Sequence, residues 1–334
     1  MPDIICLGEA LVDMVATSHG LSLVQSPEFH KAAGGAPTNV AAGAAILGAS
    51  SGLIAQVGKD HFGEFIKQML WDAGVDLEHF QQTPDYATQL AFVALDSGGV
   101  PDFAFHVKQS ADQMLAPSAI NASYLADAQI FHLGSITLIN EPARSASLKA
   151  LDIAHDEGLL ISLDPNLRPT LWKSLDQAQD EIVELVKNAD FLKVSEQEMT
   201  FITGQEDLGS GIRALYDMGP ELIAVTRGHE GSVIFNGRQT LEIPAFRVPI
   251  IDTTGCGDAF VAASLTRFVE SENDIGDMSA DELEDIFRFA SAAAALAATA
   301  EGAIPSMPGR EEVLELIELG GVQLPEDEME PEED

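Results

Sequence analysis

A glycine-containing turn between a predicted strand and a predicted helix carries the clearest chemical signal in the chain. The segment IIDTTGCGDAF begins at Ile250 and runs into the helical pattern VAASLTRFVE. Gly255 and Gly257 let the backbone approach a ligand closely, and the N–H groups of the first helical turn, including that of Cys256, point into the loop. This arrangement is typical of an anion site. We expect the helix dipole to keep Asp258 ionised there, ready to act as a general base, although an ordinary helix start fits the same residues.

A second glycine turn, AGGAPTNVA, precedes another predicted helix. Gly34 and Gly35 leave the backbone open, so that amides at this helix start could bond sugar hydroxyls. Asp13, predicted at the end of the first strand, and Asn39 could bind vicinal hydroxyls, as polar side chains of a carbohydrate site do. A plain glycine turn and a solvated Asp13 are the alternative interpretation.

A third motif, LDPNLRPTLW, places polar residues at the predicted carboxyl end of a strand, which is the usual ligand edge of an open parallel sheet. Arg168 could steady an anionic phosphoryl group there, or it could form a salt bridge with one of the many acids. Glu198 in KVSEQEM could orient Mg²⁺ through water, or it could be a solvated acid at a helix start.

The charge balance excludes several classes of partner. Fifty-four acidic residues against seventeen Lys and Arg give a formal net charge of −37, which repels phosphate backbones and anionic lipid. We therefore expect no nucleic acid and no membrane surface as partner. Only Cys6 and Cys256 occur, and no leader-like pattern opens the chain, so a reduced, cytoplasmic location is expected. The Ala-rich stretch 289–300 is shorter than the ~20 residues of a membrane span and predicts a buried helix.

Apolar runs rich in β-forming residues alternate with helical patterns. Strands are predicted over 4–13, 51–57, 130–133, 159–163, 191–194 and 222–226. Helices are predicted over 38–47, 62–71, 142–155, 175–187 and 211–218. Alternation at this spacing predicts an α/β fold with a doubly wound, mostly parallel sheet flanked by helices.

Two alternating stretches, about 14–33 and 87–108, interrupt this order, the second around a Gly-Gly turn. They predict a small antiparallel β lid that covers a cleft, pairs with another subunit as a homodimer, or does both. We expect one domain over 1–319. The segment 320–334 is an acidic tail whose composition predicts disorder, or alternatively an interaction tail.

Taken in order, GEALVD, AGGAPTNVA, GKDHFG, SADQML, LDPNLRPTLW, KVSEQEM, VTRGHEGS, DTTGCGDAF and EGAIPSMP closely resemble the ribokinase-like (PfkB-type) sugar kinases. The resemblance extends from Ile4 to about Leu319. It implies the ribokinase-like fold and transfer of the γ-phosphoryl group of ATP to a sugar hydroxyl.

The resemblance also implies roles for individual residues. Asp258 would be the catalytic base, with the amides of Gly255, Cys256 and Gly257 as the anion hole and Arg168 near the transferring phosphoryl group. The implied sugar ligands are Asp13, Gly34, Gly35, Asn39, Arg168 and Asp258. The implied nucleotide contacts are Lys193, Ser195, Thr226, Gly228, Gly231, Gly255, Gly257 and Ser291. Glu198 would hold Mg²⁺ through water, and a monovalent cation, usually K⁺, would lie at Asp252, Thr254, Ala297, Gly302 and Ser306.

Within the family, SADQML and DPNLRPTLW look most like fructokinases, which implies a ketohexose with a primary hydroxyl as substrate. The 2-keto-3-deoxygluconate kinases share DPNLRP but usually place an arginine in the lid, where this chain has Val107. This favours a neutral sugar, while the neighbouring Lys108 keeps the acid sugar as an alternative. Two other classes remain: a dinucleotide-binding oxidoreductase, against which the missing glycine fingerprint argues, and a non-catalytic sugar-binding protein.

Overall fold

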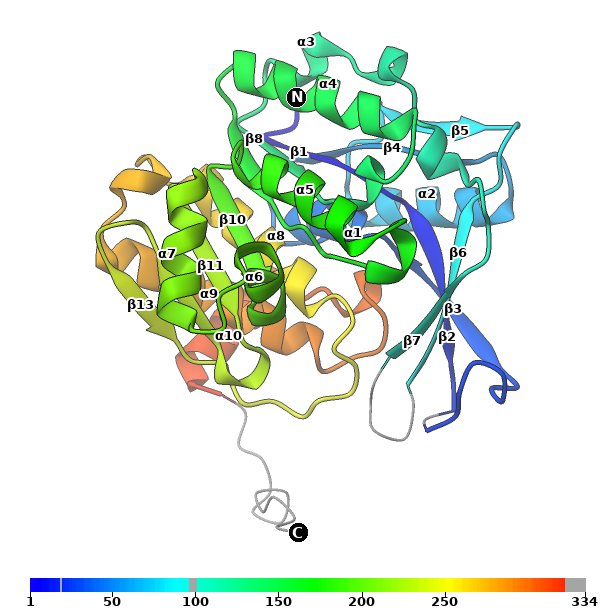
Figure 1. Cartoon of the computed structure of the whole chain (residues 1–334). Helices are drawn as coiled ribbons and strands as arrows, with labels where there is room; N and C mark the ends of the chain where they lie inside the picture. The colour runs from blue at the N-terminus through cyan, green and yellow to red at the C-terminus, as the bar shows by residue number, and fades with distance from the viewer. Residues whose placement is uncertain (19, 96–100, 322–334) are drawn as a thin grey trace.

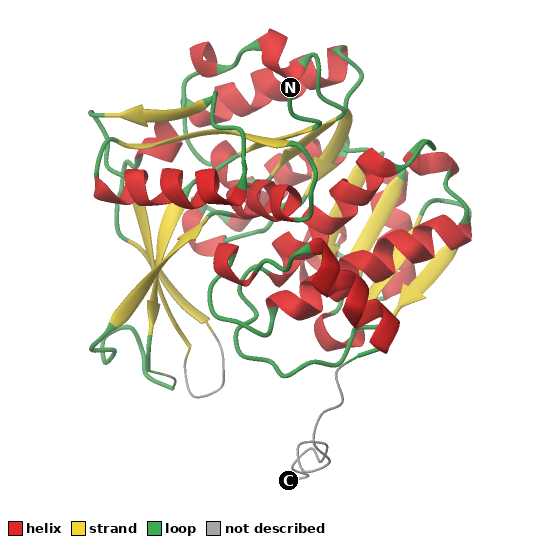
Figure 2. Cartoon of the chain, turned by 180° about the vertical axis from the view of Figure 1, so that it is seen from behind, coloured by secondary structure: helices red, strands yellow, loops and turns green. Residues whose placement is uncertain are grey.

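The computed structural model describes residues 1–18, 20–95 and 101–321 of the 334-residue chain. Its centre is a nine-stranded sheet of order β13-β12-β11-β10-β9-β8-β1-β4-β5, with helices on both faces (Figure 1; Figure 2). The β11–β12 and β12–β13 pairs are antiparallel, and the other neighbours are parallel. The predicted α/β class with a mostly parallel sheet is confirmed.

The helices and strands have the following bounds. The large sheet contains β1 (Ile4–Leu7), β4 (Ser51–Gly58), β5 (Phe80–Thr83), β8 (Ile130–Leu133), β9 (Leu160–Leu163), β10 (Phe191–Ser195), β11 (Leu222–Thr226), β12 (Ser232–Phe235) and β13 (Thr240–Ile243). One face packs against α1 (Ala36–Ile46), α2 (His61–Ala73), α8 (Cys256–Glu270), α9 (Ala280–Ala297) and α10 (Arg310–Leu319). The other face packs against α3 (Ala122–Leu125), α4 (Ala143–Asp156), α5 (Leu175–Val186), α6 (Glu196–Thr203) and α7 (Leu208–Met218). The strands and helices predicted between residues 38 and 226 are confirmed, with ends that differ by at most three residues.

The sheet order fixes one edge as the place for a ligand. From β1 the chain continues to β4 and β5 on one side, and later to β8, β9, β10 and β11 on the other. In open parallel sheets, ligands bind at the carboxyl ends of the strands, next to the point where the order reverses. The loops at the carboxyl ends of β1, β9 and β10 contain the motifs GEALVD, LDPNLRPTLW and KVSEQEM, so the topology brings these three motifs to one edge.

The prediction of a single strand over Ile4–Asp13 is wrong. The strand β1 ends before Gly8, and the chain then enters β2 (Leu11–Ala16) of a separate, smaller sheet. The reason is a close approach: a Cβ at Gly8 would lie 2.3 Å from Pro37 Cγ, so the start of α1 presses on the chain where it leaves β1. Asp13 therefore lies within β2 and does not end the first strand.

The smaller sheet has the order β3-β2-β6-β7 and includes β3 (Phe29–Gly34), β6 (Gln89–Leu95) and β7 (Pro101–Phe105). The outer pairs are antiparallel, and the central β2–β6 pair is parallel. This sheet extends away from the α/β body (Figure 1). The predicted Gly-Gly turn and the acidic tail from 322 lie outside the described residues.

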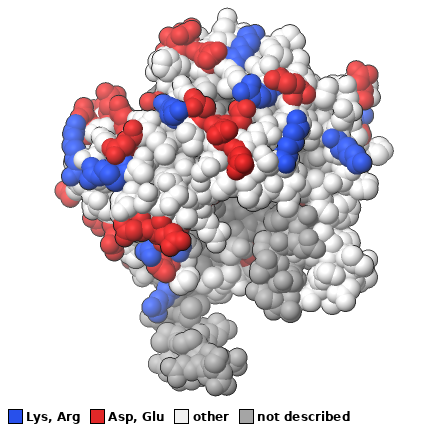
Figure 3. All heavy atoms as spheres, viewed as in Figure 1, with Lys and Arg blue, Asp and Glu red and all other residues white. Residues whose placement is uncertain are grey.

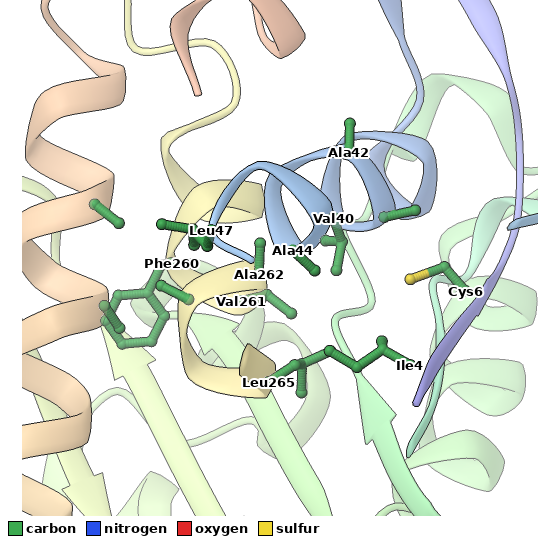
Figure 4. Close-up of a cluster of buried hydrophobic side chains, with 14 of the residues drawn as sticks. Ile4, Cys6, Val40, Ala42, Ala44, Leu47, Phe260, Val261, Ala262 and Leu265 are labelled. Carbon is green, nitrogen blue, oxygen red and sulfur yellow. The ribbon is translucent and has the colours of Figure 1, made fainter. Parts of the chain in front are cut away.

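Small side chains allow α1 and α8 to pack closely (Figure 4). Ala42, Ala44 and Ala262 are buried, and a Cβ at Gly43 of α1 would lie 2.9 Å from the Cβ of Ala262 on α8. The Ala-rich stretch lies mostly in α9 and is largely buried, as predicted. In the described part of the chain, no helix combines the length and apolar character that crossing a bilayer requires.

Candidate active site

The two glycine turns meet at a single hydrogen bond. Asn39 in the first turns of α1 donates from Nδ2 to Asp258 Oδ2 at the start of α8, with an N···O distance of 2.7 Å. Both side chains are buried, at 4% and 7% exposure. The structure thus brings together the two motifs that the sequence analysis assigned to sugar binding and to the anion site, 219 residues apart in sequence.

The turn before α8 has the backbone geometry of an anion loop. Gly255 caps the helix with a φ of 82°, and a Cβ there would lie 2.9 Å from the Cα of Ala303, so glycine is required. The amides of Gly257 and Asp258 belong to the first helical turn, which has no intrahelical acceptors for them. The Cys256 N–H donates to Thr253 O at 3.3 Å, a long bond that a phosphate oxygen could replace.

A buried ammonium group lies beneath this loop. Lys193 in β10 donates from Nζ to Asp164 Oδ2, which follows β9, at 2.8 Å, and both residues are buried. A Cβ at Gly257 would lie only 2.9 Å from Lys193 Nζ. Burial lowers the pKa of Lys193, but the carboxylates of Asp164 and Glu198 outweigh it and raise that pKa, so the ammonium stays charged.

On the sugar side, both glycines of the first turn are required by their neighbours. A Cβ at Gly34 would lie 2.0 Å from Asp13 Oδ2. Gly35 has a φ of 108°, and a Cβ there would lie 2.2 Å from the carbonyl oxygen of Glu9. The turn therefore sits directly against the Asp13 carboxyl group, as expected for residues that would hold one sugar together.

Burial raises the pKa of two acids of the site, Asp258 and Asp13. Desolvation raises the pKa of Asp258 to about 6, although the Asn39 hydrogen bond and the charges of Lys193 and Arg168 lower it. Desolvation likewise raises the pKa of Asp13 to about 7, against the opposing charge of Arg168. The helix dipole therefore does not dominate at Asp258 as expected from sequence, because burial outweighs it; the carboxyl is nevertheless mostly ionised at pH 7.

The loop that bears Arg168 is fixed by Glu198. Leu167 N–H donates to Glu198 Oε1 at 2.8 Å, while Glu198 Oε2 accepts from the backbone and the hydroxyl of Ser195 in a capping box. Asn166 in the same loop has a φ of 43°, an uncommon conformation for a residue other than glycine. Glu198 thus holds this loop in place, and its Oε1 keeps one lone pair that suits a water ligand of Mg²⁺.

The predicted nucleotide residues lie in three places, of which the anion loop with Lys193, Gly255 and Gly257 is described above. Ser195 and Thr226 end neighbouring strands and stand opposite each other in register. Gly228 and Gly231 form the turn that follows, with positive φ of 58° and 95°. Ser291 lies on α9 instead, where its hydroxyl donates to Pro244 O at 3.1 Å.

The residues predicted for a monovalent cation are drawn from three segments. Asp252 accepts from Thr254 N–H through Oδ1 and from Gly302 N–H through Oδ2, both at 2.9 Å. Ala297 ends α9, and Ser306 ends the short 3-10 helix η7 (Ile304–Ser306), where its hydroxyl donates to Ala303 O. Carboxylate, carbonyl and hydroxyl oxygens are suitable ligands for a hard cation, so the residues fit this group.

Sequence reasoning missed three buried acids beside the site. Asp164 pairs with Lys193, while Glu9 and Asp112 lie near the paired-glycine turn, and all three are at most 5% exposed. Each stands in a motif quoted above, LDPNLRPTLW, GEALVD or SADQML. The available signal was a carboxyl group inside an apolar run, since charged residues are seldom buried without a partner.

Comparison with known proteins agrees with this geometry. The model of the pfkB family carbohydrate kinases matches residues 1–310. The chain is 40% identical over 319 residues to "Probable fructokinase-6, chloroplastic" of Arabidopsis thaliana, covering 95% of this chain and 82% of that protein.

Solved structures give the same result. A fructokinase with bound ATP from Xylella fastidiosa superposes with a TM-score of 0.86 at 30% identity, covering 96% of this chain and 99% of that one. A fructokinase double mutant from Vibrio cholerae O395, bound to fructose, ADP and potassium ion, has a TM-score of 0.84 at 32% identity, covering 94% and 97%. The chain therefore belongs to the pfkB family of carbohydrate kinases.

Proposed function

We propose that the chain is an ATP-dependent fructokinase that transfers the γ-phosphoryl group of ATP to a primary hydroxyl of fructose. The observation that carries the proposal is the Asn39–Asp258 hydrogen bond of 2.7 Å. This bond joins the paired-glycine turn, to which sugar binding is assigned, to the anion loop before α8. The relatives at about 40% identity are named as fructokinases, which supports fructose as the acceptor.

In the proposed reaction, Asp258 accepts the proton of the attacking hydroxyl, and Asn39 fixes the direction of its carboxylate. The amides of the anion loop stabilise the charge that develops on the phosphoryl group, with the Lys193 ammonium below them. The guanidinium of Arg168 adds positive charge on the side of Asp13 and Asp258, since it lowers the pKa of both carboxyl groups. These residues supply the charge and position that phosphoryl transfer requires.

We expect ATP as co-substrate and a metal ion beside it, in keeping with the ATP and potassium of the two solved relatives. Mg²⁺ would neutralise phosphate charge, with Glu198 holding one of its waters. K⁺ would lie under the anion loop among Asp252, Thr254, Ala297, Gly302 and Ser306. A cation there strengthens the attraction of the loop for phosphate oxygens.

The decisive experiment is a sugar panel followed by coupled ADP release. Fructose, ribose, 2-keto-3-deoxygluconate and a nucleoside are compared at saturating MgATP, with a reaction lacking sugar as the control. We expect the highest kcat/KM with fructose. A higher kcat/KM with the acid sugar would move the substrate assignment to 2-keto-3-deoxygluconate, for which Lys108 offers a charge beside Val107. ADP release that does not depend on any sugar would contradict the kinase assignment.

The small sheet supports two further proposals. The first is that the sheet closes over the sugar, which would exclude water and limit ATP hydrolysis. The second is that its outer strands β3 and β7 pair with those of a second subunit. Light scattering at micromolar concentration tests the pairing, since a monomer would remove it. Cytoplasmic placement stays a prediction, because the relative from Arabidopsis thaliana is named as chloroplastic.

A further inference from the structure

Two buried carboxyl groups near the sugar side of the site each keep one oxygen that has no hydrogen-bond partner among the described residues. Glu9, in the turn between β1 and β2, is 2% exposed, and its Oε2 is unpaired. Asp112, in the 3-10 helix η1 (Ala111–Met114), is 5% exposed, and its Oδ1 is unpaired. A buried acceptor without a donor is costly, so the pair needs an explanation.

Glu9 holds the start of α1 through three contacts. Its Oε1 accepts the Ala36 N–H at 2.9 Å, and its carbonyl oxygen accepts the Thr38 hydroxyl at 2.7 Å. The same carbonyl oxygen would lie only 2.2 Å from a Cβ at Gly35. These residues form the paired-glycine turn and the first turn of α1, from which Asn39 reaches Asp258. The position of Glu9 is therefore transmitted to the base through one helical turn.

The charges that face Glu9 are negative. Asp112 from η1 acts on it most strongly, followed by Asp258 from α8, and α1 contributes only its backbone amide. In the described ranges, no Lys, Arg or His forms an ion pair with Glu9 or Asp112. An ionised Glu9 would thus be a buried charge among like charges, whereas the neutral acid avoids this cost and makes Oε2 a donor.

We propose that Glu9 is a positioning residue for phosphoryl transfer and acts as an uncharged carboxylic acid that holds the start of α1, and with it Asn39 and Asp258, in the catalytic arrangement. Its proton lies on Oε2, the oxygen that accepts no hydrogen bond from the described residues, and Asp112 is the charged group that acts most strongly on this carboxyl. The kinetic part of this inference rests on the proposed fructokinase activity, and the stability part does not.

The electrostatics of the site also favour the neutral form of Glu9. Burial, with the charges of Asp112 and Asp258 added, raises the pKa of Glu9 to about 7, against two backbone hydrogen bonds that lower it. Because the folded pKa lies above the ordinary value of 4.5, the contribution of Glu9 to stability is complete below pH 4.5 and is lost as the pH rises through about 7. Above that pH Glu9 ionises, and its negative charge then lies near that of Asp112 at the start of α1.

The test compares Glu9→Gln with Glu9→Ala. Glutamine keeps the acceptor for Ala36 N–H and puts a neutral donor at the position of Oε2, so we expect kcat/KM for fructose within about threefold of wild type at pH 6.5. Alanine removes the acceptor for Ala36 N–H. We then expect kcat/KM to fall by ~10- to 100-fold, because small misplacements of catalytic groups slow the reaction. A Glu9→Gln variant as impaired as Glu9→Ala would overturn the proposal, since it would show that a negative charge is needed.

The pH profile separates this role from a merely structural one. In wild type we expect kcat/KM to fall above about pH 7 as Glu9 ionises, and the Glu9→Gln variant should lack this alkaline fall. Asp207→Asn is the matched control, because Asp207 is also a helix-capping acid, bonded to Ser210 N–H, but lies on α7 away from the site. Equal alkaline falls in wild type and Glu9→Gln would contradict the proposal.

Thermal unfolding gives a readout that does not depend on turnover. Between pH 6 and pH 8 the Tm of wild type should fall more than that of Glu9→Gln, because only wild type has the carboxyl that ionises. An equal fall would overturn the inference even if the enzyme phosphorylates fructose. A wild-type protein without fructose-dependent ADP release would instead overturn the proposed function, while this comparison would still decide the state of Glu9.

Discussion

Asp258 combines burial, the neutral donor Asn39 and a nearby ammonium, which is an arrangement that suits a base. We expect Asp258→Asn to leave the fold intact and to lower kcat by ~10²–10⁴, the usual contribution of a positioned base. Coupled ADP release and thermal melting measure the two effects. Asp277→Asn is the control, because that exposed acid forms a surface ion pair with Arg238. Near-normal turnover of a folded Asp258→Asn variant would show that another group takes the proton.

The same acid sets the acidic side of the pH profile. With its pKa raised to about 6 by burial, Asp258 is protonated below that pH and can no longer accept the hydroxyl proton. We therefore expect kcat/KM for fructose to fall as the pH drops through about 6, with less change in the KM for ATP. A profile that stays flat down to pH 5 would contradict the assignment of the base.

Gly257 offers a second test at a single residue. A Cβ there would lie 2.9 Å from Lys193 Nζ, so Gly257→Ala should displace the ammonium or the anion loop. We expect kcat to fall by ~10²–10³, the range seen when one group that stabilises a transition-state anion is lost. Gly209→Ala is the matched control, since Gly209 is the second residue of α7 as Gly257 is of α8, and a Cβ there has ordinary contacts. Equal kcat values for the two variants would argue against a role for this contact.

At the scale of elements, the packing of α1 on α8 sets the distance between sugar turn and base. Ala262 is fully buried between them (Figure 4), and a leucine there would force the helices apart at a cost of ~1–3 kcal/mol of stability. We expect Ala262→Leu also to lower kcat, because the Asn39–Asp258 bond spans the same two helices. Ala150→Leu on α4 should destabilise similarly and spare turnover, since Ala150 is equally buried away from both helices. Parallel loss of kcat in both variants would point to general destabilisation.

The sequence predicts most elements but not where the chain changes sheets. Buried parallel strands read as continuous apolar runs, so the strands from Ser51 onwards are recognisable. The run from Ile4 to Asp13 looks like one strand because both sheets bury its apolar residues. The chain leaves β1 where Gly8 packs closely on Pro37, and this contact joins residues that no local pattern connects. The same limit applies to Glu9, whose partner Ala36 lies 27 residues away.

The parts of the candidate site that depend on glycine spacing could be predicted from the sequence. The parts that depend on buried charges were harder to predict. Both glycine turns and Asp258 follow from local rules on backbone conformation and helix starts. The Lys193–Asp164 pair and the pKa of Asp258 depend on burial, which is a property of the assembled sheet and its helices. Sequence reasoning therefore singled out Asp258 by motif, and its role as the base stays a prediction, while the structure supplies the physical reason for its raised pKa.

At the scale of the whole molecule, the net charge of −37 is the dominant feature. Figure 3 shows clusters of acidic side chains on one face, several with a Lys or Arg beside them. Like charges repel in the compact state, and salt screens exposed charges beyond ~8–10 Å at 0.10–0.15 M. We expect Tm to rise when salt is raised from 20 mM to 1 M, because screening relieves more repulsion than it removes attraction from the surface ion pairs.

The choice of salt separates screening from specific cation binding. Tetramethylammonium chloride screens charge, but its bulky cation has no place among the backbone and carboxylate oxygens around Asp252. A rise in Tm that is equal in this salt and in KCl would reflect screening alone. An additional rise in KCl, lost in Asp252→Ala, would place a monovalent cation at that loop. A fall in Tm with both salts would contradict our expectation, because it would show that attraction within surface ion pairs outweighs repulsion among the acidic side chains.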